Sequence, residues 1–325
     1  MKAVVCAKLD DFGAIALTDA PDPSPGENQA LVEVRAASLN FPDVLMARGL
    51  YQVKPPVPFV PGTELAGVVR GVGKGVQGFA AGDRVFGFAG YGGFAELCTV
   101  DTARLMKLPE GIGFEDGAAF GLTYGTALHA LRDCGHLARG ETLAVLGASG
   151  GTGIAAIECG KVIGATVIAC ASSDEKLALC RELGADQVVN YANEDLRARL
   201  DEITGKRGVD VVFDAVGGPY TEPALRATGW RGRLLVIGFA AGDIPKIALN
   251  LALLKERSIV GVYWGDWTRR EPQKHALNMA DLAQWIREGI VRPAITEKIG
   301  LAEVPKALER MAKRQVLGKV VVVPR

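Results

Sequence analysis

The chain has 325 residues, of which 49% are hydrophobic, so it is long enough to bury a large core and to form two domains. Lys and Arg together number 37, as do Asp and Glu, which gives no net charge. A chain without a net field or a run of like charges lacks the electrostatic footprint that recruits nucleic acid or an anionic membrane surface. The composition therefore disfavours both classes of partner.

The N-terminal segment 1–5 reads as a strand and lacks the features of a signal or transit peptide. No apolar run reaches 18 residues, so we expect a soluble, cytoplasmic protein. Six cysteines lie mostly in apolar stretches, without the paired spacing of a metal site, and are predicted to be small buried side chains in a reducing compartment. They are Cys6, Cys98, Cys134, Cys159, Cys170 and Cys180.

The first 122 residues contain short apolar alternations, such as 30–35 and 65–70, separated by glycine and proline turns at 23–26 and 73–75. Short strands at this spacing are typical of a compact, partly closed β domain.

From Leu122 onward, apolar strand-like runs alternate with helix-like stretches, which predicts a doubly wound, six-stranded parallel sheet. After Gly289 short strands return, so we assign 1–122 and 290–325 to one domain and 123–289 to the other. The space between two such domains is the default ligand site. The predicted strands are 142–146, 166–171, 187–190, 209–213, 233–237 and 258–263.

A glycine-rich turn, Gly-Ala-Ser-Gly-Gly-Thr-Gly at 147–153, follows the first of these strands and precedes a helix-like stretch. Such a turn lets backbone approach a pyrophosphate, whose charge meets the unpaired N–H groups at the helix start. The first glycine of the usual Gly-x-Gly-x-x-Gly spacing is replaced by alanine, so the prediction depends on the strand–turn–helix context. The predicted contacts are Ala148, Ser149, Gly150, Gly151, Thr152 and Gly153.

The end of the second strand predicts the choice of cofactor. An NAD-binding unit would present a carboxylate there, about 20 residues beyond the turn, but this chain has Ser172 and Ser173, with Lys176 following. Hydroxyls and an ammonium would hold a 2′-phosphate, which favours NADPH. The alternative makes Ser172 a helix N-cap, with two acidic residues in the first turn, and both interpretations can hold together.

Several segments resemble the zinc-free quinone oxidoreductase (zeta-crystallin-like) branch of the medium-chain dehydrogenase/reductase family. The resemblance implies a Rossmann domain with a GroES-like domain. Ala144 departs from the branch's Leu as a packing change, and Glu158 departs from its Gln as a surface difference. The segments are 37–43, 48–51, 61–64, 81–85, 92–96 and 140–161.

The resemblance also implies site residues in the GroES-like part and at its boundary with the next domain. Asn40 would lie by the nicotinamide and assist catalysis, or else cap a helix before Pro42. Tyr51 would line the substrate cleft and donate a hydrogen bond to the acceptor, while Asp43 would support the helix start. Thr123, at the domain joint, would lie near the nicotinamide or begin the following helix.

Further cofactor contacts are implied in the later part of the chain. Tyr191 would lie by the adenosine phosphate with Lys176, or simply end a strand. Phe239 and Ala240 would place backbone against the nicotinamide carboxamide. Trp264 would line the cleft or pack at a subunit contact, and Lys319 would reach the cofactor or be solvated.

The ligands of the family's zinc enzymes are missing, so we expect no metal. Segment 38–43 has no cysteine, Thr63 stands where a histidine ligand would be, and 86–100 has no four-cysteine loop. The three histidines are isolated and predicted to be structural. Without a Lewis acid to polarise an alcohol, hydride delivery to a conjugated acceptor is favoured over alcohol oxidation.

The sequence thus predicts an NADPH-dependent reductase of quinones or related conjugated carbonyls. A 2-alkenal or enoyl-thioester reductase and a non-catalytic NADPH-binding protein remain as alternatives. The apolar run 258–263 would form an open edge strand, which predicts a homodimer through that edge.

Overall fold

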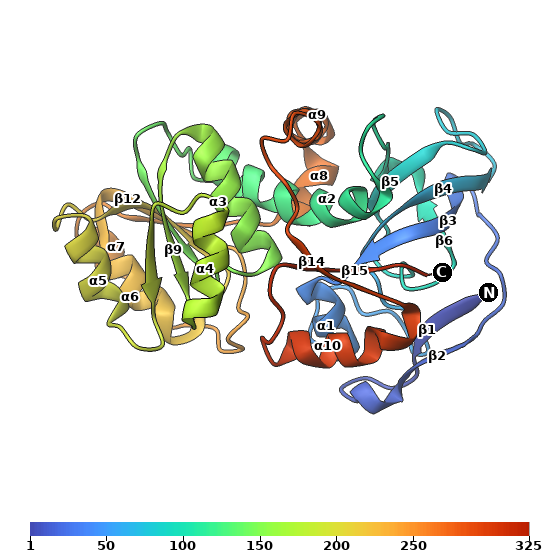
Figure 1. The fold of residues 1–325 in the computed structure, drawn as a ribbon, viewed down its shortest axis with the longest axis horizontal. Helices are drawn as coiled ribbons and strands as arrows, with labels where there is room; N and C mark the ends of the chain where they lie inside the picture. Colours follow the sequence, from blue (N-terminus) through green and yellow to red (C-terminus); the bar gives the residue numbers. More distant parts are fainter. Residues whose placement is uncertain (325) are drawn as a thin grey trace. The chain divides into compact units, whose positions relative to one another are not determined.

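A computed structural model describes residues 1–324 (Figure 1). Contacts divide the chain into two compact units. Unit 1 comprises Met1–Leu122 and Arg292–Arg325, and unit 2 comprises Thr123–Val291. Helix α2 (Phe114–Leu128) contains the boundary between Leu122 and Thr123.

Unit 1 is built around a seven-stranded sheet in the order β14-β15-β3-β4-β5-β7, with β6 also paired to β3. A separate two-stranded sheet joins β1 to β2. This is the β-rich domain that the sequence predicts. Its strands and helices are β1 (Lys2–Cys6), β2 (Ile15–Asp19), β3 (Gln29–Ser38), α1 (Phe41–Ala47), β4 (Glu64–Val72), β5 (Arg84–Phe88), β6 (Leu97–Asp101), β7 (Leu105–Lys107), β14 (Ile295–Ile299), α10 (Val304–Ala312) and β15 (Lys319–Val322).

The long strand β3 holds this unit together because it pairs with β4, β6 and β15. Alternate residues such as Val32 and Val34 are buried in the core. The pairing with β4 is tight at Gly67, where a Cβ atom would lie 2.0 Å from the carbonyl oxygen of Glu33. Only glycine fits at that register position.

Unit 2 is a six-stranded, all-parallel sheet in the order β10-β9-β8-β11-β12-β13. Helices α3 and α4 cover one face, and α5 and α6 cover the other (Figure 1). The doubly wound parallel sheet of the sequence prediction is confirmed. The elements are β8 (Thr142–Leu146), α3 (Gly151–Ile163), β9 (Thr166–Ala171), α4 (Asp174–Glu182), β10 (Gln187–Asn190), α5 (Leu196–Ile203), β11 (Val209–Asp214), α6 (Thr221–Arg226), β12 (Thr228–Val236), α7 (Asn250–Leu253), β13 (Ser258–Gly261), α8 (Trp264–Arg270) and α9 (Pro272–Arg287).

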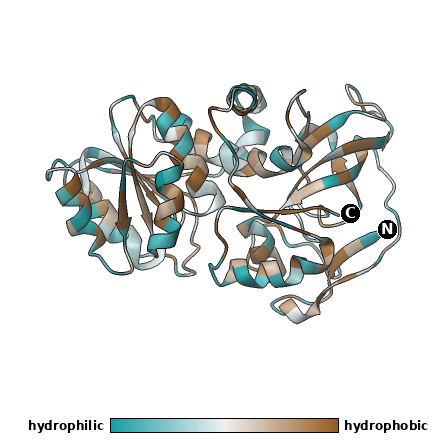
Figure 2. Ribbon diagram, viewed as in Figure 1, coloured by the Kyte–Doolittle hydropathy of each residue, from teal (hydrophilic) through white to brown (hydrophobic). Residues whose placement is uncertain are grey.

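The inner strands β8, β9 and β11 are buried along almost their whole length and are largely hydrophobic (Figure 2). That is why these strands appear in the sequence as apolar runs. Four strand boundaries differ from the prediction. Strand β11 extends to Asp214, β12 ends at Val236 rather than at residue 237, and β13 ends at Gly261 rather than at residue 263. Strand β12 also begins at Thr228 rather than at residue 233, and its first part was missed because polar Arg231 interrupts the apolar pattern.

None of the helices in residues 1–324 is long and apolar enough to cross a membrane. The cysteine prediction is confirmed for five thiols, which are free and buried; Cys134 is half-buried.

Candidate functional site

The glycine-rich turn of unit 2 has the predicted strand–turn–helix geometry. Strand β8 ends at Leu146, Gly147 has φ +69°, and α3 begins after Gly150 as its N-cap. A Cβ atom on Gly153 would lie 2.3 Å from the carbonyl oxygen of Gly147, so the first helical turn packs directly on the strand end. The first N–H groups of α3 have no partner within the helix, which makes this turn suitable for a phosphate.

A second loop, which the sequence analysis missed, lies against this turn. The Asp214 carboxylate at the end of β11 accepts hydrogen bonds from the N–H groups of Val216 and Gly217, both 2.9 Å, and from the Thr221 hydroxyl at 2.6 Å. The Val216 side chain lies 2.9 Å from where a Cβ of Gly147 would be. The available signal was a lone carboxylate that ends an apolar run before two glycines.

The end of β9 brings the predicted 2′-phosphate residues together. The Lys176 ammonium donates a hydrogen bond to the Ser172 hydroxyl at 3.2 Å. The interpretation of Ser172 as N-cap is wrong: Ser173 caps α4, and its hydroxyl accepts a hydrogen bond from the Lys176 N–H at 3.4 Å. Since the backbone turns one residue later than expected, the Ser172 side chain is not used in capping.

Tyr191 completes this corner of unit 2. It follows β10, and its N–H donates to the carbonyl of Ala171, immediately before Ser172, at 3.1 Å. Its ring lies 4.3 Å from that of Tyr220, centroid to centroid. A hydroxyl, an ammonium and an aromatic pair thus gather where the strands β9 and β10 end.

The loop after β12 carries Phe239 and Ala240. The Ala240 N–H donates to the carbonyl of Ala215 at 3.2 Å, so this loop lies against the one that follows β11. The carboxyl ends of β8, β11 and β12 therefore share one edge of the sheet with the glycine turn, which is where open α/β sheets bind ligands.

Two further predicted residues of unit 2 lie at α2. Thr123 is buried within α2, so the alternative in which it begins a helix is wrong; that helix already starts at Phe114. The Trp264 side chain is buried and packs on α2, since a Cβ on Gly125 would lie 2.9 Å from its ring.

The Glu158 side chain is 9% exposed and accepts a hydrogen bond from the Tyr124 hydroxyl. Its interpretation as a surface difference is wrong because α3 is buried over most of its circumference. The substitution therefore places a carboxyl group, paired with a phenol, inside unit 2.

In unit 1, a buried polar cluster surrounds Asn40. The Lys319 ammonium donates hydrogen bonds to Asn40 Oδ1 and Ser38 Oγ, both at 2.8 Å, and lies 3.7 Å from Glu64 Oε2. The Asn40 Nδ2 group donates to Ser38 Oγ at 3.1 Å and Glu64 Oε2 at 3.2 Å. Lys319 is only 3% exposed, so its interpretation as a solvated lysine is wrong.

Glu64 was missed by the sequence analysis. Its second oxygen, Oε1, accepts a hydrogen bond from the Leu122 N–H at 2.7 Å, so the carboxylate joins β4 to α2. The only signal was an acidic residue at the start of an apolar strand, directly after Pro61-Gly62-Thr63.

Asp43 holds the start of α1, as predicted. One carboxylate oxygen accepts from the Asn40 N–H at 2.8 Å, and the other accepts from the N–H groups of Gly62 and Thr63 at 3.2 and 2.9 Å. Burial raises the pKa of Asp43 to about 7, although the Asn40 hydrogen bond and Lys319 act in the opposite direction. Burial also lowers the pKa of Lys319, against the effects of Glu64 and Asp43.

Tyr51 lies in the loop after α1, half-buried against the core of unit 1. Thr63 is fully buried, with its hydroxyl 3.4 Å from Asn40 Nδ2. Across residues 1–324, no group of three or more His, Cys, Asp or Glu side chains is arranged to hold a metal ion.

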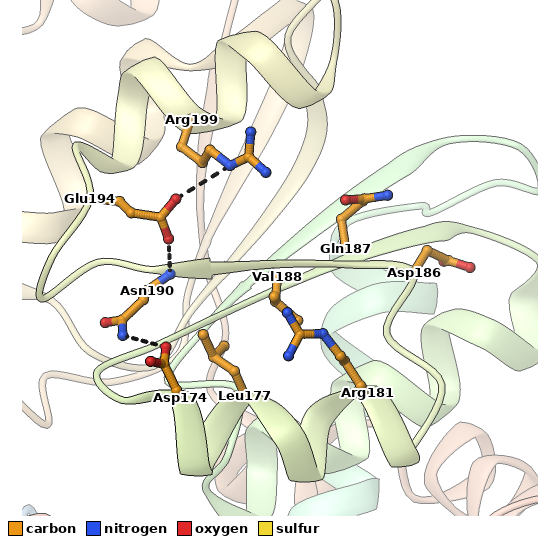
Figure 3. A pocket seen from close by; sticks show the side chains of 9 residues that line it. All are labelled: Asp174, Leu177, Arg181, Asp186, Gln187, Val188, Asn190, Glu194 and Arg199. Carbon is orange, nitrogen blue, oxygen red and sulfur yellow. Dashed lines mark hydrogen bonds and ion pairs between the residues drawn. The ribbon is translucent and has the colours of Figure 1, made fainter.

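A polar hollow of about 300 Å³ lies between α4, β10 and α5 (Figure 3). Asn190 there donates to Asp174 at 2.8 Å through its side chain and to Glu194 at 2.7 Å through its N–H, and Arg199 pairs with Glu194. No predicted site residue lines the hollow, although Asn190 directly precedes Tyr191 in the chain.

Comparison with known proteins covers most of the chain. Residues 26–110 match the alcohol dehydrogenase GroES-like domain family, and residues 151–281 match the zinc-binding dehydrogenase family. Quinone oxidoreductase-like protein 2 of Rattus norvegicus is 37% identical over 320 residues, covering 98% of this chain and 91% of the relative. Human quinone oxidoreductase is 31% identical over 295 residues, covering 90% and 88%.

Solved structures with the same fold include Escherichia coli quinone oxidoreductase complexed with NADPH. It has a TM-score of 0.92 and 28% identity, over the whole of both chains. CurK enoyl reductase has a TM-score of 0.86 and 25% identity, over 99% of this chain and 98% of that one.

Proposed function

Since this chain belongs to the zinc-free quinone oxidoreductase branch of the medium-chain dehydrogenase/reductase family, we propose that it is an NADPH-dependent reductase of quinones or related conjugated carbonyls. The observation that carries this proposal is the pairing of the Ser172 hydroxyl with the Lys176 ammonium at the end of β9. A carboxylate at that place would repel a 2′-phosphate, whereas these two groups bind one.

The residues of unit 2 fit such a dinucleotide. The turn 147–153 receives the pyrophosphate through backbone N–H groups, and a Cβ on Gly150 would lie 3.5 Å from its nearest protein neighbour, the Gly147 oxygen. Tyr191 lies with Lys176 at the adenosine phosphate. Backbone of Phe239 and Ala240 binds the nicotinamide carboxamide, and Thr123, Trp264, Asn40 and Lys319 are the remaining contacts that we propose. NADPH, when bound, supplies the hydride.

The chain's own contribution to catalysis is positioning and hydrogen bonding. The Tyr51 hydroxyl donates to the acceptor oxygen that gains charge. Asn40 orients the reacting groups, and its side-chain amide is itself fixed by Lys319 and Glu64. Tyr51→Phe should lower turnover of enones by about 10²-fold, yet barely affect quinones, whose product charge is better delocalised. Loss of NADPH binding in this variant would instead make Tyr51 a cofactor contact.

A substrate panel tests the proposal. Purified protein is mixed with NADPH or NADH and a naphthoquinone, a 2-alkenal or a crotonyl thioester, and nicotinamide absorbance is followed. NADPH-dependent reduction of the quinone or alkenal is expected. Faster reduction of the thioester would favour the enoyl reductase alternative, in line with the similarity to CurK enoyl reductase. NADPH binding without any reduction would favour the non-catalytic alternative.

We also propose a homodimer through the edge strand β13. Large apolar side chains lie exposed at this end of unit 2, and a second copy of the same edge would cover them. Light scattering should give twice the chain mass, and a monomer that is stable on dilution contradicts the proposal. The exposed apolar side chains are Trp230, Ile244, Leu249, Leu253, Ile259 and Tyr263.

The free state of all six cysteines supports the proposed cytoplasmic location.

A further inference from the structure

Outside the proposed cofactor site, unit 2 holds a thiol, an imidazole and a carboxylate that contact one another in that order. Cys134 Sγ lies 3.4 Å from His129 Nε2, and His129 Nδ1 lies 2.9 Å from Asp133 Oδ2. Asn278 on α9 donates a hydrogen bond to the same Asp133 oxygen at 3.0 Å. A nucleophile, a base and an orienting carboxylate are thus within hydrogen-bonding distance of one another.

A π-helix, His129–Cys134, creates this arrangement. Its wider turn brings residues i and i+5 onto one face, so the thiol of Cys134 meets the ring of His129. The Gly135 N–H bonds the Ala130 carbonyl in the same i to i+5 pattern. Single π-helical turns of this kind occur frequently at functional sites.

The His129 ring is fixed in the orientation that a base needs. It stacks on Trp267 of α8, with ring centroids 3.9 Å apart. Asp133 accepts the Nδ1–H, which leaves the Nε2 lone pair directed at the thiol. His275, on α9, makes an edge contact with Trp267, with ring centroids 6.0 Å apart, and burial together with a smaller effect of His129 lowers its pKa to about 4.

The thiol itself is protonated at rest. Burial raises the pKa of Cys134, and the carboxylates of Asp133 and Glu271 raise it further. Attack therefore requires removal of the proton by His129 as general base, the role that the imidazole plays in serine and cysteine triads. The two carboxylates also disfavour an anionic reaction partner.

We propose that Cys134 is a base-assisted nucleophile that forms a thioether with small, uncharged α,β-unsaturated carbonyl compounds. The thiol proton passes to His129 Nε2 as sulfur bonds to the β-carbon, and the alkene electrons move to the carbonyl oxygen. The protonated imidazole then returns the proton to the α-carbon. No oxidant, reductant or NADPH takes part, so the proposal is independent of the reductase activity.

The test is labelling by N-ethylmaleimide at pH 7 without nicotinamide nucleotide, followed by intact mass and peptide mapping. One adduct on Cys134 is expected, because the other five thiols are buried. The rate constant should exceed that of N-acetylcysteine by at least about tenfold if a general base assists. 3-Maleimidopropionate, compared in the same way, should lose this advantage. A Cys134 rate at or below that of N-acetylcysteine overturns the proposal without any variant.

Variants separate base assistance from simple exposure of the thiol. His129→Gln should slow labelling by about 10²-fold, and Asp133→Asn should give a smaller loss. His275→Gln is the matched control, since it removes the other imidazole of the same aromatic cluster, and it should change the labelling rate far less than His129→Gln does. In His129→Gln the labelling rate should rise about tenfold per pH unit, because the fraction of Cys134 present as thiolate rises by that factor. In the native chain the labelling rate should rise less steeply with pH. Equal rates and equal pH profiles in both proteins contradict the proposal.

Discussion

Replacing Lys319 by methionine is expected to destabilise unit 1 strongly, because it removes one member of a buried ion pair. The stem of the side chain keeps its volume, but three hydrogen bonds disappear, to Ser38, Asn40 and the Leu39 carbonyl. The Glu64 carboxylate is left 1% exposed without its cationic partner.

Loss of one partner from a buried pair typically lowers the free energy of unfolding by about 3–5 kcal/mol. The matched control is Lys2→Met, which breaks the Lys2–Asp19 pair of the same unit. Those side chains are 53% and 82% exposed, so a loss of about 0–1 kcal/mol is expected. The comparison isolates burial, since charge and side-chain type are the same.

The assay must follow unit 1 specifically. All four tryptophans, at 230, 264, 267 and 285, belong to unit 2, so intrinsic tryptophan fluorescence reports on that unit. Hydrogen exchange of peptides from β3 and β15 reports on unit 1. The expected loss corresponds to exchange about 10²- to 10⁴-fold faster in Lys319→Met, because 1.4 kcal/mol is a factor of ten.

The result that refutes this reasoning is an effect of Lys319→Met no larger than that of Lys2→Met. A double variant, Lys319→Met with Glu64→Leu, should be less destabilised than the sum of the single variants, because neither charge is then left unpaired. Simple additivity would show that the ammonium and the carboxylate do not interact.

Other outcomes follow from the same structure. Lys176→Ala should weaken NADPH binding by about ten- to a hundredfold while leaving NADH binding nearly unchanged, as measured by fluorescence titration; equal losses would exclude a phosphate contact. Gly153→Ala should destabilise unit 2 in tryptophan-monitored unfolding, since its Cβ would meet backbone at 2.3 Å, whereas Gly150→Ala should fold normally and lose affinity for NADPH. The pKa of the Asp43 carboxyl is about 7 in the folded state and 3.8 in the unfolded reference state. Between these two pH values the folded state therefore binds more protons than the unfolded state. Its contribution to stability should be complete below about pH 4 and be lost as the pH rises through 7, and Asp43→Asn should remove that slope from the hydrogen-exchange stability of unit 1. Purified protein should contain no stoichiometric zinc by elemental analysis, and a chelator should not change the reduction rate.

The sequence predicts features whose signals are local. The inner strands of unit 2 are largely apolar because both faces of the sheet are covered there, and Ser172 and Lys176 are only four residues apart in the sequence. The Lys319 cluster has no local signal, since Lys319 and Ser38 are 281 residues apart in sequence. Glu158 was misjudged because one helix in isolation does not reveal that it is covered on nearly all sides. The His129–Cys134 contact depends on a π-helical turn, which the regular 3.6-residue period does not predict.

The position of β15 determines the order in which this protein can be completed on the ribosome. It lies between β14 and β3, so a strand translated near the end of the chain pairs with one translated near its beginning. Unit 2 is contiguous and is synthesised entirely between these two segments, and domains fold as units during synthesis. The nascent β3 edge and the carboxylate of Glu64 must therefore wait, exposed, until Lys319 emerges. A chain truncated before β15 would consequently leave the β3 edge of the N-terminal unit unpaired, while unit 2 would keep all of its own residues.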